Sequence, residues 1–453
     1  MSERPWSGRR LHFVGVGGAG MSGYARAAHA LGASVSGSDR ALTPYLERLR
    51  DEGVLDAHIG HDAANVPAGE DIELIHSSAI APENPERLAA RARNLSDRPR
   101  ADLLAELTAL RRTIAVAGAH GKTTTSSMIV HILRAAGIDP GWLVGSSVGA
   151  GLANSHWSAG EWLVVEADES DRSMLSLCVE IAVLTNVELD HHAAFSSLGE
   201  LREAFCAFLA GAREAIVVWD RPDLLALLPS AVPEGGGSPE IVPYDMQAFE
   251  PRPGGSRFCW RGSDVRLSVP GAHNALDATA ALEVARLLGV ADGAQHAITG
   301  FEGAMRRFQR LGSTERGAVV IDDYAHHPTE IAATLAAART LAPKRLVAVF
   351  QPHLYSRTAL LAEEFGAALA QADVVALLDV YPARELPEDH PGVSGLMLVS
   401  TAREHAGARP VLWLATFEQA ELALRELLDA GDLCVMMGAG DIDALARKLV
   451  VAP

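Results

Sequence analysis

The run from residue 118 to residue 125 carries the clearest chemical signal in the sequence. It reads Gly-Ala-His-Gly-Lys-Thr-Thr-Thr and follows the apolar segment 113–117, which predicts a buried strand. In a strand–glycine loop–helix order, backbone N–H groups surround phosphate oxygens, Lys122 can reach the β- and γ-phosphates, and Thr123 can bind Mg²⁺. The loop is shorter than the general phosphate-loop pattern, because Val116 stands where the first glycine of that pattern would be. We therefore expect a short phosphate-binding loop at the start of a helix over 123–136.

A second glycine run, 15–20, follows the apolar segment 11–14 and reads Gly-Val-Gly-Gly-Ala-Gly. This G-x-G-x-x-G pattern lets the backbone turn tightly and approach a phosphate at a helix N-terminus. Asp39 ends the next predicted strand, about where a ribose-binding acid sits in dinucleotide-binding proteins. Taken alone, the pattern is compatible with a dinucleotide site, with another nucleotide site, and with a glycine turn that binds nothing.

Acidic and histidine residues follow two further predicted strands. The run 166–171 reads Glu-Ala-Asp-Glu-Ser-Asp, and the run 186–192 reads Asn-Val-Glu-Leu-Asp-His-His. Carboxylates at the carboxyl edge of a parallel sheet can hold Mg²⁺, and Glu166 is the acid nearest its strand. His191 is the candidate in the second run. Read alone, each run leaves open the alternative of a solvated surface loop.

Strands that alternate with helices must position these loops. A strand, a glycine loop and a helix begin at about residue 11 and again at about residue 113, and a third strand-rich start comes at 318–321. Such alternation predicts an α/β fold with mainly parallel sheets. The chain of 453 residues is long enough for about three domains, which we place at 1–107, 108–311 and 312–453. The pattern also predicts a small antiparallel addition over 257–269 and a single helix over 356–372.

Composition and charge exclude several classes of protein. The net charge of −18 argues against a broad nucleic-acid surface, although local donors can still bind anionic ligands. The four cysteines lie far apart, which argues against a disulfide framework or a zinc site of the usual spacing. No apolar run is long enough to cross a bilayer, and residues 1–10 lack the apolar core of a signal peptide. We expect a cytoplasmic protein without membrane insertion, and the oligomeric state stays open.

Taken together and in this order, the four motifs resemble those of the Mur ligases, and the resemblance covers nearly the whole chain. Within that family the sequence looks like the member that adds L-alanine. The runs that carry this closer likeness are His-Phe-Val-Gly-Val-Gly-Gly-Ala-Gly-Met-Ser-Gly at 12–23, Ser-Ser-Ala-Ile at 77–80 with Asn-Pro-Glu at 84–86, the acidic run 166–171, Asp-Asp-Tyr-Ala-His-His-Pro-Thr-Glu at 322–330, Gln-Pro-His-Leu-Tyr-Ser-Arg-Thr at 351–358 and Asp-Val-Tyr-Pro at 379–382.

The resemblance implies three domains with one substrate each. A Rossmann-like N-terminal domain binds the UDP-sugar, a central P-loop domain binds ATP, and a Rossmann-like C-terminal domain binds the amino acid. The residues that match the UDP-sugar site are Gly15, Gly17, Gly18, Ala19, Gly20, Asp39, Ser77, Ser78 and Asn84. Those that match the ATP site are Gly118, Ala119, His120, Gly121, Lys122, Thr123, Thr124, His273, Asn274, Arg307 and Asp323. The candidates on the amino-acid side are His326, His353 and Arg357, for which an ordinary structural role stays open.

The resemblance also implies the reaction. ATP phosphorylates the lactyl carboxylate of UDP-N-acetylmuramate, and the amine of L-alanine attacks the acyl phosphate, giving UDP-N-acetylmuramoyl-L-alanine, ADP and phosphate for peptidoglycan precursor synthesis. Lys122 and Mg²⁺ neutralise the transferring phosphoryl group, and the metal ligands implied are Thr123, Glu166 and His191. The catalytic residues implied are Lys122, Glu166, His191 and Arg357. The sequence departs from the family pattern at Ala119, Ala193, Asp277 and Leu354.

Three competing interpretations stay open at this point. The first is a recycling ligase of the same family, which joins a whole murein tripeptide to UDP-N-acetylmuramate. The second is an NAD-dependent dehydrogenase, based on residues 15–20 and Asp39, but it leaves residues 118–125 without a purpose. The third is an inactive nucleotide-binding or scaffold protein, which only the departures at Asp277 and Leu354 support.

Overall fold

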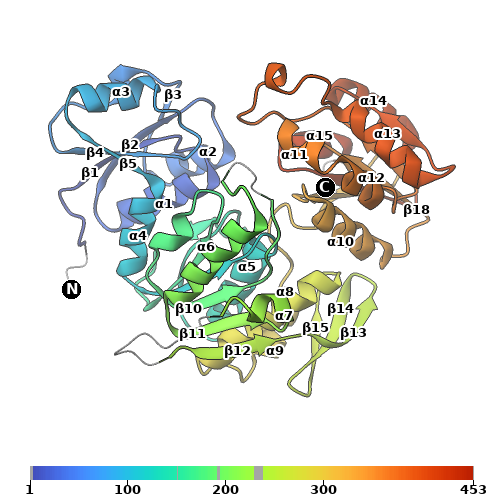
Figure 1. The fold of residues 1–453 in the computed structure, drawn as a ribbon, viewed down its shortest axis with the longest axis horizontal. Helices are drawn as coiled ribbons and strands as arrows, with labels where there is room; N and C mark the ends of the chain where they lie inside the picture. Colours follow the sequence, from blue (N-terminus) through green and yellow to red (C-terminus); the bar gives the residue numbers. More distant parts are fainter. Residues whose placement is uncertain (1–3, 150, 191–193, 229–237, 452–453) are drawn as a thin grey trace. The chain divides into compact units, whose positions relative to one another are not determined.

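The computed structural model describes residues 4–149, 151–190, 194–228 and 238–451. By its internal contacts the chain forms two compact units (Figure 1). The first unit contains Met1–Asp245 and Ala280–Ala294, and the second contains Met246–Thr279 and Gln295–Pro453. Helix α8, Ala272–Leu287, runs across this division. In the described ranges, every helix is too short or too polar to span a bilayer.

The N-terminal part of the first unit is a five-stranded parallel sheet in the order β3-β2-β1-β4-β5. Its strands are β1 (Arg10–Val14), β2 (Ser34–Asp39), β3 (His58–Ile59), β4 (Ile72–His76) and β5 (Ser96–Pro99). The helices are α1 (Ala19–Ala30), α2 (Pro44–Asp51), α3 (Pro85–Ala92) and α4 (Arg100–Ala109), with the 3-10 turn η1 (Ala63–Asn65). Strands β2 and β3 are added on one side of β1, and β4 and β5 on its other side, so the strand order switches between β1 and β4. Ligands of doubly wound sheets bind at such a switch point.

The central part of the first unit is a seven-stranded sheet in the order β12-β11-β10-β6-β9-β7-β8. Its strands are β6 (Arg112–Ala117), β7 (Gly141–Leu143), β8 (Ser155–His156), β9 (Trp162–Ala167), β10 (Val179–Leu184), β11 (Ala212–Trp219) and β12 (Glu240–Tyr244). Helices α5 (Lys122–Ala135), α6 (Leu198–Ala210) and α7 (Pro222–Leu225) and the turn η2 (Ser173–Ser176) complete it. All strand pairs are parallel except β7 with β8. Because β10, β6 and β9 are neighbours, the three loops singled out in the sequence leave the sheet side by side.

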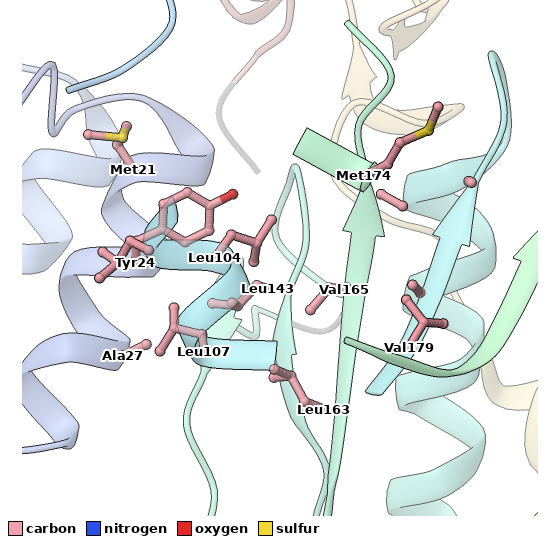
Figure 2. Packing of buried hydrophobic residues seen from close by; sticks show 14 of the residues in the cluster. Met21, Tyr24, Ala27, Leu104, Leu107, Leu143, Leu163, Val165, Met174 and Val179 are labelled. Atoms are coloured by element: carbon pink, nitrogen blue, oxygen red, sulfur yellow. The ribbon is translucent and has the colours of Figure 1, made fainter. Parts of the chain in front are cut away.

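One continuous apolar core joins the two sheets of the first unit. Helix α1 packs against β7 and β8, and α4 packs against β6 and η2. Figure 2 shows Tyr24 of α1 and Leu104 of α4 in the same cluster as Leu143 of β7 and Val165 of β9. Burial of this surface fixes the N-terminal sheet against the central sheet, because apolar area removed from water stabilises the packed state.

The second unit contains a three-stranded antiparallel sheet and a six-stranded sheet. The small sheet comprises β13 (Gln247–Arg252), β14 (Gly255–Trp260) and β15 (Ser263–Leu267), which confirms the antiparallel addition expected from the sequence. The larger sheet has the order β16-β17-β21-β18-β19-β20 and is parallel except at its β16 edge. Its strands are β16 (Gln309–Ser313), β17 (Val319–Asp323), β18 (Arg345–Phe350), β19 (Val374–Leu377), β20 (Val411–Trp413) and β21 (Asp432–Met437).

Helices cover both faces of the six-stranded sheet. Helices α10 (Pro328–Arg339), α12 (Ala362–Leu369) and α13 (Gly395–Ala406) share a core with Leu346, Ala348 and Phe350 of β18. Helices α14 (Phe417–Leu427) and α15 (Ile442–Leu449) share a second core with Val347 and Val349 of the same strand. Successive side chains of a strand point to opposite faces, so a strand covered on both sides is apolar throughout. The remaining short elements are α9 (Ala294–Ala297), α11 (Tyr355–Leu360), η3 (Ile298–Gly300) and η4 (Pro387–Asp389).

The α/β fold with mainly parallel sheets is confirmed, but one predicted helix is wrong. The single helix expected over 356–372 is two helices, α11 and α12, which meet at Leu361. Leu361 has a non-helical backbone (φ −111°) and its side chain packs against the core of the sheet. Tertiary packing thus overrides the helix propensity of an alanine- and leucine-rich segment.

Candidate active site

The first glycine loop is held by neighbouring backbone and side-chain groups. The N–H of Gly15 donates to the carbonyl oxygen of Ser38 at 2.9 Å, and the N–H of Gly17 donates to Asp39 at 2.8 Å. Thr43 donates its hydroxyl to the carbonyl oxygen of Gly17 at 2.8 Å. A Cβ atom on Gly17 would lie only 2.9 Å from oxygens of Asp39 and Thr43, so any larger residue would displace these side chains. One function of Asp39 is therefore to shape the loop.

The start of helix α1 can accept an anion. Gly18 is its N-cap, no side chain caps the helix, and no acidic residue stands in its first turn. Helix N-termini carry unpaired N–H groups and a partial positive charge, which suits phosphate. Ser77, which follows β4, lies against the loop, since a Cβ atom on Gly15 would be 3.2 Å from the Cβ atom of Ser77. The sheet thus brings these two candidates together at the switch point.

The other two candidates of the first sheet have different surroundings. Ser78 is exposed in the turn after β4. Asn84 is the N-cap of α3 and its Oδ1 atom accepts from the N–H of Glu86 at 2.9 Å. The sequence Asn-Pro-Glu thus has a structural purpose as a helix start, with proline in the first turn.

The second glycine loop makes the turn from β6 into α5. Gly121 is the N-cap of α5 in the left-handed conformation (φ 83°), and no side chain caps this helix either. Gly118 has φ 138°, and a Cβ atom there would lie 2.1 Å from the hydroxyl of Thr185, so the position requires glycine. Thr185 donates to the carbonyl oxygen of His120 at 2.6 Å. Thr185, which follows β10, therefore contacts the loop and holds it by a hydrogen bond.

Asn186 holds the second glycine loop from the same side. Its Oδ1 atom accepts from the N–H of His120, and its Nδ2 atom donates to the carbonyl oxygen of His120, both at 2.9 Å. The His120 ring lies 3.2 Å from a carboxylate oxygen of Glu188. The run at 186–192 was expected to complete a metal or phosphate site. In its described part, Asn186 and Glu188 contact the loop, while His191 and Ala193 lie outside the described residues.

Lys122 is partly buried among oxygen atoms. Its Nζ atom donates to the carbonyl oxygen of Gly118 at 2.6 Å and forms an ion pair with Glu169 at 2.8 Å. Burial alone lowers the pKa of Lys122, but the charges of Glu169 and Asp168 more than offset this and raise it. Lys122 therefore carries a fixed positive charge at the loop, as the neutralisation of a phosphoryl group requires.

The acidic run leaves the sheet at the end of β9. Glu166 accepts from the N–H of Gly145 at 2.7 Å, and a Cβ atom on Gly145 would lie 3.0 Å from its carboxylate. A cavity of about 100 Å³ lies between α1 and this carboxylate, and its walls include Gly20, Tyr24 and Asp168. Glu166 and Asp168 of this run thus face helix α1 across the cavity.

The residues at this edge fit a magnesium ion. Thr123 is buried in the first turn of α5, which starts after β6, and Glu166 belongs to the adjacent strand β9. A hydroxyl and a carboxylate are hard oxygen ligands, which Mg²⁺ prefers. Thr124 is buried beside Thr123 in the same helix turn. This donor set has the chemistry that Mg²⁺ prefers, and Thr123 and Glu166 stay predicted ligands.

The second unit holds the four remaining candidates for the ATP site. Burial lowers the pKa of His273 to about 4, so its ring is neutral. Asn274 is buried and donates to the carbonyl oxygen of Pro270 at 2.6 Å. Asp323 accepts from two backbone N–H groups at 2.7 Å. The guanidinium of Arg307 lies over the ring of Tyr324, at 5.1 Å from its centroid.

The three candidates for the amino-acid side come together. The rings of His326 and His353 meet edge to face with centroids 6.1 Å apart, and His353 stacks on Tyr381 at 5.7 Å. The Nη1 atom of Arg357 lies 3.4 Å from Nδ1 of His353, and Arg357 is only 3% exposed. Leu354, the departure between them, has a left-handed backbone (φ 72°). A buried guanidinium beside two imidazoles suits a carboxylate ligand.

Several residues at the site were not predicted. Glu169, the partner of Lys122, lies in the quoted acidic run, but closeness to the strand favoured Glu166. Glu330 lies 3.7 Å from Arg307 and also completes the capping box at the start of α10. The pattern Pro-Thr-Glu at 328–330 is a sequence signal for that helix start. Tyr324 and Tyr381 carried no signal beyond their presence in quoted runs.

Fold and site together define an α/β protein with two glycine loops at uncapped helix starts, a geometry that suits phosphate groups. The chain matches "Mur ligase family, catalytic domain" over residues 10–112, "Mur ligase middle domain" over 116–285 and "Mur ligase, glutamate ligase domain" over 306–440. It is 41% identical to the UDP-N-acetylmuramate–L-alanine ligase of Bradyrhizobium sp. (strain ORS 278), over 97% of this chain and 96% of that protein. The chain belongs to the Mur ligase family.

Solved structures of the family show the same fold. The structure of UDP-N-acetylmuramate–alanine ligase from Thermotoga maritima matches with a TM-score of 0.82 and 25% identity, over 97% of this chain and 98% of that one. A murein peptide ligase from Psychrobacter arcticus matches with a TM-score of 0.72 and 23% identity, over 98% of this chain and 100% of that one. The second likeness shows the fold alone.

Proposed function

We propose that the protein is an ATP-dependent ligase that joins L-alanine to the lactyl carboxylate of UDP-N-acetylmuramate. The observation that carries the proposal is that one compact unit contains two uncapped glycine loops, after β1 and after β6, with Lys122 and the acidic run between them. The near-full-length relatives named UDP-N-acetylmuramate–L-alanine ligase support the choice of both substrates. A dehydrogenase would have no use for the second loop.

The proposal gives each part of the chain one task. The domain at 1–107 holds the UDP-sugar diphosphate at the start of α1, and the domain at 108–311 holds the ATP phosphates at the start of α5. The domain at 312–453 supplies the amino-acid side. Thr123, Glu166 and His191 hold Mg²⁺, which neutralises phosphate charge when it is bound. We place the reaction in the cytoplasm.

The chemistry proceeds in two transfers. A carboxylate oxygen of the lactyl group attacks the γ-phosphorus of ATP, and the bond from that phosphorus to the ADP oxygen breaks. Lys122 provides a positive charge where negative charge spreads over the transferring group. The nitrogen of L-alanine then attacks the acyl carbon, the carbon–oxygen bond to phosphate breaks, and the amine loses its proton. The products are an amide, ADP and inorganic phosphate.

Recognition of the incoming amino acid falls to Arg357, His326 and His353. A guanidinium pairs with a carboxylate through two parallel hydrogen bonds, so Arg357 can orient L-alanine by its carboxylate. Burial strengthens that pairing, because water does not compete well for the guanidinium. The two imidazoles would then border the amine.

The test is phosphate release from ATP with Mg²⁺ and UDP-N-acetylmuramate, with and without L-alanine. We expect release that requires both substrates, and a product heavier by one alanyl residue. Release with the murein tripeptide but not with L-alanine would reassign the chain to the recycling ligases. If none of the amines tested leads to phosphate release, the ligase activity is refuted.

A further inference from the structure

Arg100 reaches from the N-terminal domain into the acidic run of the central domain. It is the first residue of α4, and its guanidinium donates from Nε to Asp171 at 2.6 Å and from Nη2 to Asp168 at 2.8 Å. The side chain is 16% exposed. One side chain from helix α4 of the N-terminal domain thus joins two carboxylates that follow β9 of the central sheet.

Both carboxylates also shape the acidic run itself. The other oxygen of Asp168 accepts from the N–H of Ser170 at 3.0 Å, and the other oxygen of Asp171 accepts from the N–H of Ser173 at 3.1 Å. Each aspartate therefore closes a local turn with one oxygen and binds Arg100 with the other. The guanidinium fixes both turns relative to each other.

Glu169 lies inside the first of these turns, between Asp168 and Ser170, and pairs with Lys122. Glu169 is 2% exposed, and its carboxylate lies 2.8 Å from the Nζ atom of Lys122. A shift of the acidic run would move this carboxylate and with it the ammonium of the second glycine loop. The same shift would move Glu166, three residues earlier in the run.

The guanidinium of Arg100 packs closely against Gly20, the last glycine of the first loop. A Cβ atom on Gly20 would lie 3.2 Å from Nη1 of Arg100. In dinucleotide-binding domains the third glycine of the pattern allows close packing of helix and strand. Here the neighbour is an arginine that passes to the next domain. Asn154 forms a second tie, because it donates to the carbonyl oxygen of Ala19 and to the hydroxyl of Ser22.

We propose that Arg100 is a positioning residue that joins the UDP-sugar loop to the acidic run and so sets the nucleotide and metal groups in place. The inference rests on the proposed function for the meaning of both loops. Arg100 acts through Asp168 and Asp171, and Gly20 is the position that admits it. The planar guanidinium binds two carboxylates at fixed angles, which a lysine ammonium cannot do.

The experiment compares Arg100→Lys and Asp171→Asn with the matched control Arg98→Ala. Arg98 forms ion pairs with Glu73, Asp102 and Glu106, all within the N-terminal domain. Its loss therefore weakens that domain without touching the acidic run. Binding of Mg²⁺–ADP by calorimetry, thermal unfolding and the steady-state constants are measured for each full-length variant.

We expect Arg100→Lys to weaken Mg²⁺–ADP binding and to lower kcat by roughly 10- to 100-fold, the range typical for loss of a group that supports a metal site from outside its ligand shell. Asp171→Asn should give a smaller shift in the same direction. Arg98→Ala should change both by less than about threefold while it lowers the unfolding temperature. The KM for UDP-N-acetylmuramate should change less than kcat in Arg100→Lys, since Arg100 does not contact that substrate in the proposal.

Two results would overturn the inference. In the first, Arg100→Lys has the same Mg²⁺–ADP affinity and the same kcat as Arg98→Ala. The contacts of Arg100 would then be structural ion pairs without a positioning role. The second result applies if Arg100→Lys does not fold. In that case Asp171→Asn would overturn the inference by binding Mg²⁺–ADP as tightly as the wild type does. Calorimetry keeps this test separate from the proposed function: a wild-type chain that does not ligate L-alanine refutes the function, whereas the nucleotide affinities still decide the role of Arg100.

Discussion

Replacing Glu86 with glutamine should loosen the first glycine loop, although Glu86 does not touch it. Glu86 is fully buried on α3 and accepts hydrogen bonds from four side chains. The donors are the ring of His12 at 2.8 Å, the hydroxyl of Ser38 at 2.7 Å, the ring of His61 at 3.0 Å and the amide of Asn65 at 3.2 Å. A glutamine places an N–H₂ group against one of these donors and carries no charge. The network around Ser38 must then rearrange.

The pKa of Glu86 gives the size of the effect. Burial by itself raises this pKa, but hydrogen bonds from His12 and Ser38 outweigh it and lower the value from 4.5 to about 2. The difference corresponds to about 3 kcal/mol of folding free energy held by the charged form. Because the pKa is lowered in the folded state, this stability is present above pH 4.5 and is lost as the pH falls toward 2. The glutamine variant should lack this dependence on pH.

Amide hydrogen exchange reports the consequence at the loop. The N–H groups of Gly15 and Val16 donate to the carbonyl oxygen of Ser38, whose hydroxyl binds Glu86. We expect these amides to exchange on the order of 100-fold faster at pH 7 in Glu86→Gln, as loss of about 3 kcal/mol implies. Glu83→Gln, an exposed change three positions earlier, is the control. Equal exchange in wild type and Glu86→Gln would refute the link between this network and the loop.

Three further predictions concern the other parts of the chain. Lys122→Ala should lower kcat by roughly 10²- to 10³-fold with an unchanged circular dichroism spectrum, and near-normal phosphate release would remove the loop from the mechanism. Arg357→Lys should raise the KM for L-alanine about tenfold or more and leave the KM for ATP unchanged; equal shifts in both would argue against a carboxylate contact. Burial raises the pKa of Asp322 from 3.8 to about 7, so stability should fall by roughly 1.4 kcal/mol per unit as the pH rises from 5 to 7. Asp322→Asn should abolish that slope in urea unfolding, and a slope that persists would assign it to another group.

Most of the sheet cores could be predicted because their strands are apolar. β1, β6, β17 and β18 lie between layers of helices, and such strands read as continuous apolar runs that end at a loop. The edge strands could not be found in this way. β3 has two exposed residues and β5 reads Ser-Asp-Arg-Pro, so neither has an apolar face to reveal it.

The candidate site divides in a similar way. Lys122 and the glycines at 118 and 121 stand in a local pattern, and the backbone conformations at both glycines need no distant information. Which acid pairs with Lys122 depends on where the chain leaves β9 beside β6. No local sequence pattern predicts that position. Proximity to the strand pointed to Glu166, whereas Glu169 is the acid that turns back to the ammonium. The domain boundaries and the assigned roles stay predictions.

Local donors decide how an acidic protein can bind anionic substrates. The chain carries a net charge of −18, yet neither α1 nor α5 has an acidic residue in its first turn. Each helix start offers backbone N–H groups, and α5 adds a lysine whose charge is held by Glu169. Coulomb attraction over a few ångströms outweighs repulsion from distant surface carboxylates, because dissolved salt screens charges that lie far apart. Acids close to the ammonium do not work against this arrangement, because they keep Lys122 charged and in position for a phosphate.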